Sequence, residues 1–150
     1  MIELSKEQFD KFADELQKEI IDEELKIYNE HIVTLFHNPQ NWGKLSPEET
    51  SITHAYKGTC GDTMEFYLKI RNNVIEKITF LTDGCGASVA TGSQTTLLLQ
   101  GKSLEFAGNL KAEDIDSALH GLPEDHKHCA ELAARTIKQA IEKYKASKRE

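Results

Sequence analysis

The chain has 150 residues, 39% of them hydrophobic and 29% charged, and this size and composition are typical of one globular domain with a buried core. No apolar run approaches the roughly 20 residues that span a bilayer, so we expect no membrane segment. The formal net charge is −7 and there is no basic stripe, so nucleic acid is not an expected partner.

Acidity is concentrated in the first 30 residues, which carry ten acidic and four basic side chains. Such a start lacks the basic and apolar blocks of a secretory signal, so we expect a cytoplasmic protein. Ser5 is a candidate N-cap, and apolar residues then recur at helical spacing. These residues are Phe9, Phe12, Ala13, Leu16, Ile20 and Ile27. We predict a helix over about 6–26, whose apolar stripe either covers the domain or forms a docking or dimerisation element.

A second helix is predicted over 28–36, because the residue before Pro39 is pushed out of the helical region. Three candidate strands follow at 51–57, 63–71 and 74–81. In the second of them apolar and polar residues alternate, as in a half-buried strand. Only two asparagines separate the second and third strands, and asparagine tolerates the positive φ of a tight turn. This stretch therefore predicts a three-stranded antiparallel sheet.

After the strands the pattern becomes helical. We predict a helix over 87–100 with Gly101 as its stop, a short helix that opens at Asn109 or Lys111, and a last amphipathic helix over about 127–145. Strands first and helices after predict an α+β fold. The expected architecture is a three-stranded antiparallel sheet with helices packed on one face, plus an extra N-terminal helix.

Three cysteines, Cys60, Cys85 and Cys129, lie at the edges of the predicted elements. Their odd number and wide spacing argue against a disulfide framework. Side chains at such edges can converge on one rim while a rigid frame holds them. Cys85 and Cys129 also start helices, and the positive end of a helix favours thiolate, the form that binds metal.

Oxygen and nitrogen donors accompany the cysteines. Asp62 follows Cys60 by two residues, so both point to one side if the backbone there is extended. His128 precedes Cys129, and both can face one site only at a frayed or capped helix end, which suggests that one binds while the other waits. Sulfur ligands suit zinc, copper(I) and iron–sulfur clusters. A carboxylate is a harder and more exchangeable ligand, so we interpret Asp62 as a weak point that permits transfer.

From about Tyr28 to Lys143 the chain resembles the IscU/NifU-type iron–sulfur cluster assembly scaffolds. The matching strings are YNEHIVTLFHNPQNWG, GTCGDTMEFYLKI, FLTDGCGASVATGS, GKSLE and HKHCAELAARTIKQAI. They run in the family's order at closely similar separations, and the CGD, GCGAS and HC elements together are specific. On this basis we divide the chain into an acidic amphipathic N-terminal helix extension (1–27), a scaffold domain (28–146) and a polar tail (147–150).

The resemblance implies a non-enzymatic scaffold that assembles a cluster from iron and desulfurase-derived sulfur and transfers it to apo-proteins. The implied ligand set, for the cluster and for metal, is Cys60, Asp62, Cys85, His128 and Cys129. A [2Fe–2S] cluster is favoured over [4Fe–4S], and zinc is a candidate occupant of the protein as isolated. The implied partners are a cysteine desulfurase and apo iron–sulfur recipient proteins, with a homodimer as a candidate assembly. Persulfide is expected first on Cys129, with Cys60 as the second candidate.

The chain departs from the family where the IscU branch carries Leu-Pro-Pro-Val-Lys, a segment read by an Hsp70-type chaperone. Here Leu122 and Pro123 are followed by Glu124, Asp125 and His126, so recognition by that chaperone is not expected. His126 occupies the position of that lysine and is a candidate extra ligand. It would share a face with Cys129 if the last helix begins early enough. The acidic N-terminal helix is a second departure.

Other interpretations stay open at this point. One cysteine alone is most simply a small buried apolar residue, Asp62 can cap a turn, and His128 can be a surface side chain. The runner-up function is a zinc-dependent sulfurtransferase that accepts persulfide sulfur from a desulfurase, although the stretch from Cys85 to Cys129 lacks the insertion typical of the SufU-type branch. A structural zinc module is a third interpretation. A Cys–His hydrolase is disfavoured, because no oxyanion-hole loop is evident.

Overall fold

A three-stranded antiparallel sheet in the order β1-β2-β3 forms the centre of the fold. The structure, a computed structural model, describes residues 3–148. The strands are β1 (Ile52–Lys57), β2 (Thr63–Arg71) and β3 (Val74–Thr82). Asn72 and Asn73 join β2 to β3 with φ values of 54° and 62°, so the predicted tight turn is confirmed.

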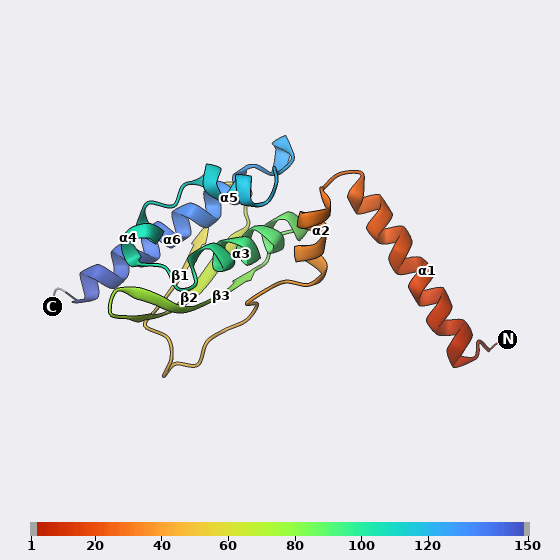
Figure 1. The fold of residues 1–150 in the computed structure, drawn as a ribbon, viewed down its shortest axis with the longest axis horizontal. Helices are drawn as coiled ribbons and strands as arrows, with labels where there is room; N and C mark the ends of the chain where they lie inside the picture. Colours follow the sequence, from red (N-terminus) through yellow and green to blue (C-terminus); the bar gives the residue numbers. More distant parts are fainter. Residues whose placement is uncertain (1–2, 149–150) are drawn as a thin grey trace.

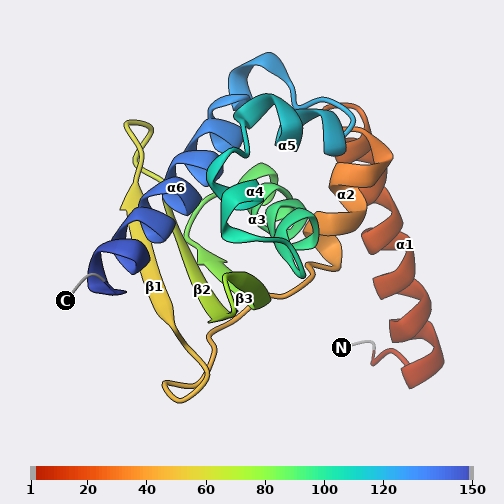
Figure 2. The same ribbon diagram turned by 60° about the vertical axis from the view of Figure 1, so that its left-hand side comes forward.

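Helices pack on one face of this sheet, as predicted, with α3 and α6 lying directly against the strands (Figures 1 and 2). The helices are α1 (Lys6–Leu25), α2 (Glu30–His37), α3 (Gly86–Leu99), α4 (Leu104–Gly108), α5 (Ala112–Ala118) and α6 (His128–Lys148), with a 3₁₀ turn over Glu124–His126. The α+β class is therefore confirmed. The short α4 was not predicted. The proposed division of the chain at residues 27 and 146 stays a prediction, and α6 itself continues to Lys148.

Alternation along β2 places Met64, Phe66 and Leu68 in the core, each fully buried beneath the helices. Phe80 on β3 lies beside them and is also fully buried. On α3, Gly92 faces Phe80 so closely that a Cβ there would collide with the aromatic ring. A glycine at this position therefore lets α3 approach the sheet.

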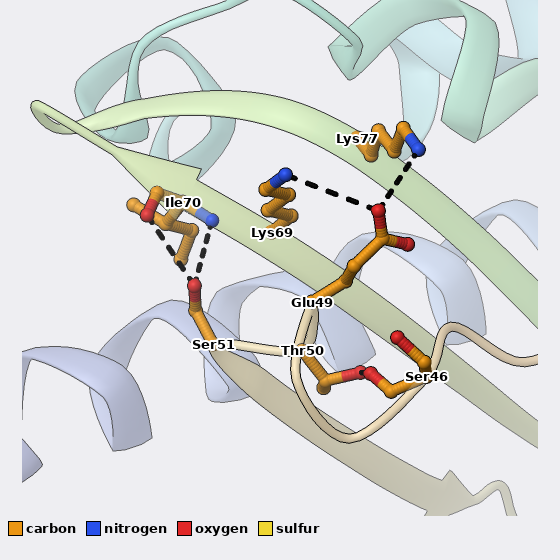
Figure 3. Close-up of polar contacts among 7 residues, drawn as sticks. All are labelled: Ser46, Glu49, Thr50, Ser51, Lys69, Ile70 and Lys77. Atoms are coloured by element: carbon orange, nitrogen blue, oxygen red, sulfur yellow. Dashed lines mark hydrogen bonds and ion pairs between the residues drawn. The ribbon is translucent and has the colours of Figure 1, made fainter.

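The link between α2 and β1 is fastened to the sheet at the end where the β2–β3 turn lies (Figure 3). Ser51 Oγ accepts a hydrogen bond from the Ile70 amide at 2.8 Å. Glu49 lies 3.2 Å from Lys77 Nζ and 3.9 Å from Lys69 Nζ. These contacts hold that end of the sheet, while the opposite end carries the β1–β2 link with Cys60.

Helix α1 begins as predicted, with Ser5 and Gln8 forming a reciprocal capping box. It then projects away from the body of the protein (Figure 1), and none of its residues is buried. Phe9 is 58% exposed and Ile20 is 44% exposed, so the expectation that the apolar stripe covers the domain is wrong for the described residues. Among the described residues, side chains of α1 reach the body at His37, which bonds Glu24 at 2.8 Å and lies 3.5 Å from Gln17.

No helix within residues 3–148 combines the length and the apolar character needed to cross a membrane.

Candidate metal centre

The β1–β2 link forms a compact turn at one end of the sheet. The Gly58 amide donates to the Asp62 carbonyl at 2.9 Å, and the Gly61 amide donates to the Gly58 carbonyl at 3.0 Å. Gly61 has φ of +95°, a conformation that a side chain disfavours. The turn thereby presents Cys60 and Asp62 at the rim where α3 and α6 begin.

Three of the predicted ligands converge at this rim. The donor atoms of Cys60, Asp62 and His128 all lie within 4.8 Å of one another. Cys60 is exposed, whereas Asp62 and His128 are half-buried, so the group is open to solvent. A pocket of about 290 Å³ adjoins it, with Cys60 and His128 in its wall beside Glu131 and Arg135. One sulfur, one oxygen and one nitrogen donor can therefore meet one metal or one cluster edge at an accessible place.

Cys129 lies beneath this group and is fully buried. Its Sγ is 3.8 Å from His128 Nε2, so the two neighbours do face one site. His128 is the first residue of α6, which is the helix-end position that the sequence required for this pairing. Which of the two side chains binds while the other waits stays a prediction.

Ser88 connects the carboxylate to the buried thiol, a contact that we did not predict. Its hydroxyl donates to Asp62 Oδ2 at 3.4 Å and lies 3.5 Å from Cys129 Sγ. Ser88 is in the first turn of α3, three residues after Cys85, so helical spacing could have indicated it. Gly84 keeps this corner open, because a Cβ there would lie 3.0 Å from Asp62 Oδ2 and collide with Ser88.

Cys85 stands apart from the three-residue group and next to a histidine from another segment. It is exposed and occupies the N-cap of α3, as predicted. Its Sγ lies 4.0 Å from Nδ1 of His126. The α6 helix begins only at His128, so the condition under which His126 would share a helix face with Cys129 is not met. His126 reaches the rim through the preceding 3₁₀ turn instead.

Burial is the main influence on the Cys129 thiol and raises its pKa to about 11. The hydrogen-bond contact with the Ser88 hydroxyl opposes this shift, while negative charge on Cys85, Asp62 and Cys60 adds to it. For Cys129 the expected preference for thiolate at a helix start is therefore wrong. A helix terminus is worth at most about 2 kcal/mol, and loss of hydration outweighs it here.

The raised pKa predicts slow alkylation of Cys129 in the metal-free, reduced protein. A shift from the ordinary 9.0 to about 11 lowers the thiolate fraction at pH 8 by about 100-fold, and thiolate is the reacting form. We expect iodoacetamide to modify Cys129 at least that much more slowly in the folded protein than in urea, with the rate rising as pH approaches 11. Peptide mass spectrometry over time measures both rates, and equal rates would contradict the prediction.

The sequence of the chain is similar to a known family and to several known proteins. Residues 27–150 match the sequence model of the family described as NifU-like N terminal domain. The iron-sulfur cluster assembly scaffold protein IscU 1 of Archaeoglobus fulgidus is 36% identical over 118 residues, covering 79% of this chain and 76% of the relative. The corresponding Aquifex aeolicus protein, named IscU, is 38% identical over 119 residues, covering 78% and 75%.

The fold also has a solved counterpart. The crystal structure of the N-terminal part of a nitrogen-fixing NifU-like protein from Brucella abortus superposes with a TM-score of 0.67. The similarity covers 81% of this chain and 96% of that chain at 15% identity, so it supports the fold assignment only. The family match begins at residue 27, and helix α1 lies before it.

Proposed function

Because the chain belongs to the NifU-like N-terminal domain family, we propose that it is a scaffold on which an iron–sulfur cluster is assembled and from which the cluster is transferred. The observation that carries the proposal is the convergence of Cys60, Asp62 and His128 within 4.8 Å, with Cys129 3.8 Å from His128. The relatives named as scaffolds support this function over zinc-dependent sulfur transfer. We further propose that the chain has no enzymatic turnover of its own.

The donor set fits a cluster as cargo. Thiolates are the usual ligands of iron–sulfur clusters, and this chain offers three free cysteines, the exposed Cys60 and Cys85 and the buried Cys129. A [2Fe–2S] cluster has four terminal positions, so we assign the fourth to Asp62 or His128. An oxygen or nitrogen ligand in place of a fourth thiolate binds less firmly, and this suits a protein that has to release what it holds.

Sulfur is proposed to arrive from a cysteine desulfurase as a persulfide. The scaffold thiolate attacks the outer sulfur, the donor's S–S bond breaks, and the donor cysteine leaves as thiolate. A two-electron reductant then converts the bound persulfide sulfur to sulfide. Cys129 and Cys60 are both acceptor candidates; exposure beside the 290 Å³ pocket favours Cys60, because Cys129 is buried beneath the rim.

Other partners follow from the same function. The cluster is handed to apo iron–sulfur recipients. The Hsp70-type chaperone is not an expected partner, because exposed acids, Glu124 and Asp125, follow Pro123. The bare apolar stripe of α1 is proposed as a docking or dimerisation element, with the chain acting in the cytoplasm.

Anaerobic reconstitution with iron, cysteine and a cysteine desulfurase tests the scaffold proposal. We expect brown protein that contains iron and acid-labile sulfide in equal amounts, with the spectrum of a [2Fe–2S] centre. A colourless protein that binds only zinc after this treatment would overturn the proposal. Failure of every cysteine to accept sulfur from the desulfurase would favour a purely structural zinc site.

Replacing Asp62 with alanine is expected to slow transfer of the cluster to apo-ferredoxin by about tenfold, which corresponds to about 1.4 kcal/mol in the transfer barrier. The carboxylate is the exchangeable ligand, and without it the cluster is left to the more firmly held donors. The transfer is followed by the rise of the ferredoxin spectrum. Glu131→Ala is the matched control, because Glu131 is an exposed acid in the wall of the adjoining pocket. Equal transfer rates for Asp62→Ala and wild type would refute this role.

A further inference from the structure

The ring of His126 lies between the site and a tyrosine from a distant part of the chain. Its Nδ1 is 4.0 Å from Cys85 Sγ, and its Nε2 is 3.2 Å from the Tyr28 hydroxyl. The ring centroid lies 6.2 Å from that of His128. One nitrogen therefore faces a candidate ligand, and the other is engaged by a fixed oxygen.

The separation of Cys85 and His126 is close to that of two ligands on one ion. A thiolate at about 2.3 Å and an imidazole nitrogen at about 2.0 Å from a tetrahedral zinc ion are about 3.5 Å apart. The 4.0 Å separation in the structure needs to shorten by only about half an ångström to meet this geometry. Cys85 is exposed and makes no side-chain hydrogen bond within its helix cap, so its sulfur is free to move.

Tyr28 supplies the outer partner that a metal-binding histidine requires. For Nδ1 to bind a metal its lone pair must be free, so the proton resides on Nε2 and is donated to the Tyr28 oxygen. Tyr28 is itself held in place, because the adjacent Asn29 donates to the Leu119 carbonyl at 2.9 Å and to the Gly121 carbonyl at 3.2 Å. These bonds tie the start of α2 to the link that carries His126.

The link is fixed from its other side as well. Asp116 accepts from the Leu122 amide at 2.8 Å and from Lys127 Nζ at 3.3 Å. The position of His126 next to Cys85 is therefore built by contacts on both sides of the 3₁₀ turn.

We propose that His126 is a ligand of the site, binding through Nδ1 on the side of Cys85, with Tyr28 as its positioning residue. The site then has six donors instead of five. Cys60, Asp62 and His128 form one group, Cys85 and His126 form a second, and Cys129 lies 3.8 Å from His128 of the first group. The inference deepens the proposed scaffold function, because a second nitrogen ligand gives the cargo another exchangeable bond besides that of Asp62 or His128.

Zinc alone is the probe, since it is diamagnetic and needs no sulfur donor. The ¹⁵N spectrum of the histidine rings, recorded on the metal-free full chain before and after one equivalent of Zn²⁺, reports which nitrogen is bound and which is protonated. We expect the ¹⁵N resonance of His126 Nδ1 to shift to the range of a metal-bound nitrogen, while Nε2 stays protonated. Zinc that shifts His128 and leaves His126 unchanged would overturn the inference without any variant.

Variants give an independent measure. His126→Ala is expected to raise the zinc Kd by at least about tenfold, and Tyr28→Phe by about tenfold with His126 still bound. The effects of His126→Ala and Cys85→Ala should be less than additive, because each removes one half of the same pair. His54→Ala is the matched control, because His54 lies on β1 and bonds Gln139 of α6 at 2.8 Å. An unchanged Kd for His126→Ala would also overturn the inference.

The two proposals fail separately. If no cluster forms after reconstitution, the proposed scaffold function is refuted, but zinc binding by His126 in the ¹⁵N spectrum would still support the ligand. If the cluster assembles normally but zinc does not shift the His126 resonances, only the proposal that His126 is a ligand is refuted.

Discussion

Replacing any one of the three cysteines with alanine should leave a protein that no longer retains an iron–sulfur cluster through desalting. Thiolates hold such clusters, and loss of one leaves an iron with only weaker oxygen or nitrogen donors or water. We expect iron and acid-labile sulfide per chain to fall at least about tenfold. Elemental analysis and the visible spectrum after anaerobic reconstitution measure this loss.

The effect on folding separates the three cysteines. Cys60 and Cys85 are exposed, so their replacement should leave the unfolding free energy within about 0.5 kcal/mol of wild type. Cys129 is fully buried, so its variant is compared only at temperatures where circular dichroism confirms a folded protein. Thr59→Ala is the matched control, because Thr59 is exposed in the same turn as Cys60. Wild-type cluster content in any of the cysteine variants would contradict the ligand set.

Replacing Phe80 with alanine is expected to lower the free energy of unfolding by about 3–5 kcal/mol. The ring is fully buried on β3, 6.3 Å from the ring of Phe66 and edge-on to Trp42 at 5.2 Å. Its removal opens a cavity between the sheet and α3 that these neighbours cannot all fill. Guanidinium denaturation followed by circular dichroism measures the change.

Gly92→Ala tests the same contact from the helix side. In the wild type the added methyl group collides with Phe80, so we expect a loss of about 1–3 kcal/mol. In the Phe80→Ala background the collision is gone, and the higher helix propensity of alanine should make the same change neutral or stabilising by up to about 1 kcal/mol. Gly108→Ala is the control, because nothing lies within 4 Å of the position that its added methyl group would occupy. Additive effects in the double variant would contradict this packing.

Local patterns predicted the sheet and most helices. Period-two alternation in 63–71 and the asparagine pair at 72–73 gave the hairpin, because both signals lie within a few residues of each other. The α4 helix was missed because it has only five residues, although Ser103 caps it by accepting from the Phe106 amide at 3.0 Å. Such a short helix leaves too little periodicity to recognise.

Helix α1 shows the limit of periodic patterns. The spacing of Phe9, Phe12, Leu16 and Ile20 indicated a helix with an apolar stripe, and the helix is present. The pattern could not say what the stripe faces, because an amphipathic helix looks the same whether its partner is its own domain or another molecule. In the structure the stripe remains exposed.

The sequence by itself determined which side chains are candidate donors and that these residues lie at the start of a helix or beside a strand. These features are encoded in short strings such as Gly58–Asp62 and His128–Cys129, where each residue's neighbours decide the local backbone. Tertiary structure alone decided how deep each donor lies. Burial raised the pKa of Cys129 to about 11, against the local expectation.

Tertiary structure also decided which residues support the donors. Ser88 joins Asp62 to Cys129, and Tyr28 reaches His126 across 98 residues of chain. Hydration and hydrogen bonding depend on every segment that packs around a group, and segments distant in sequence become neighbours only when the chain folds.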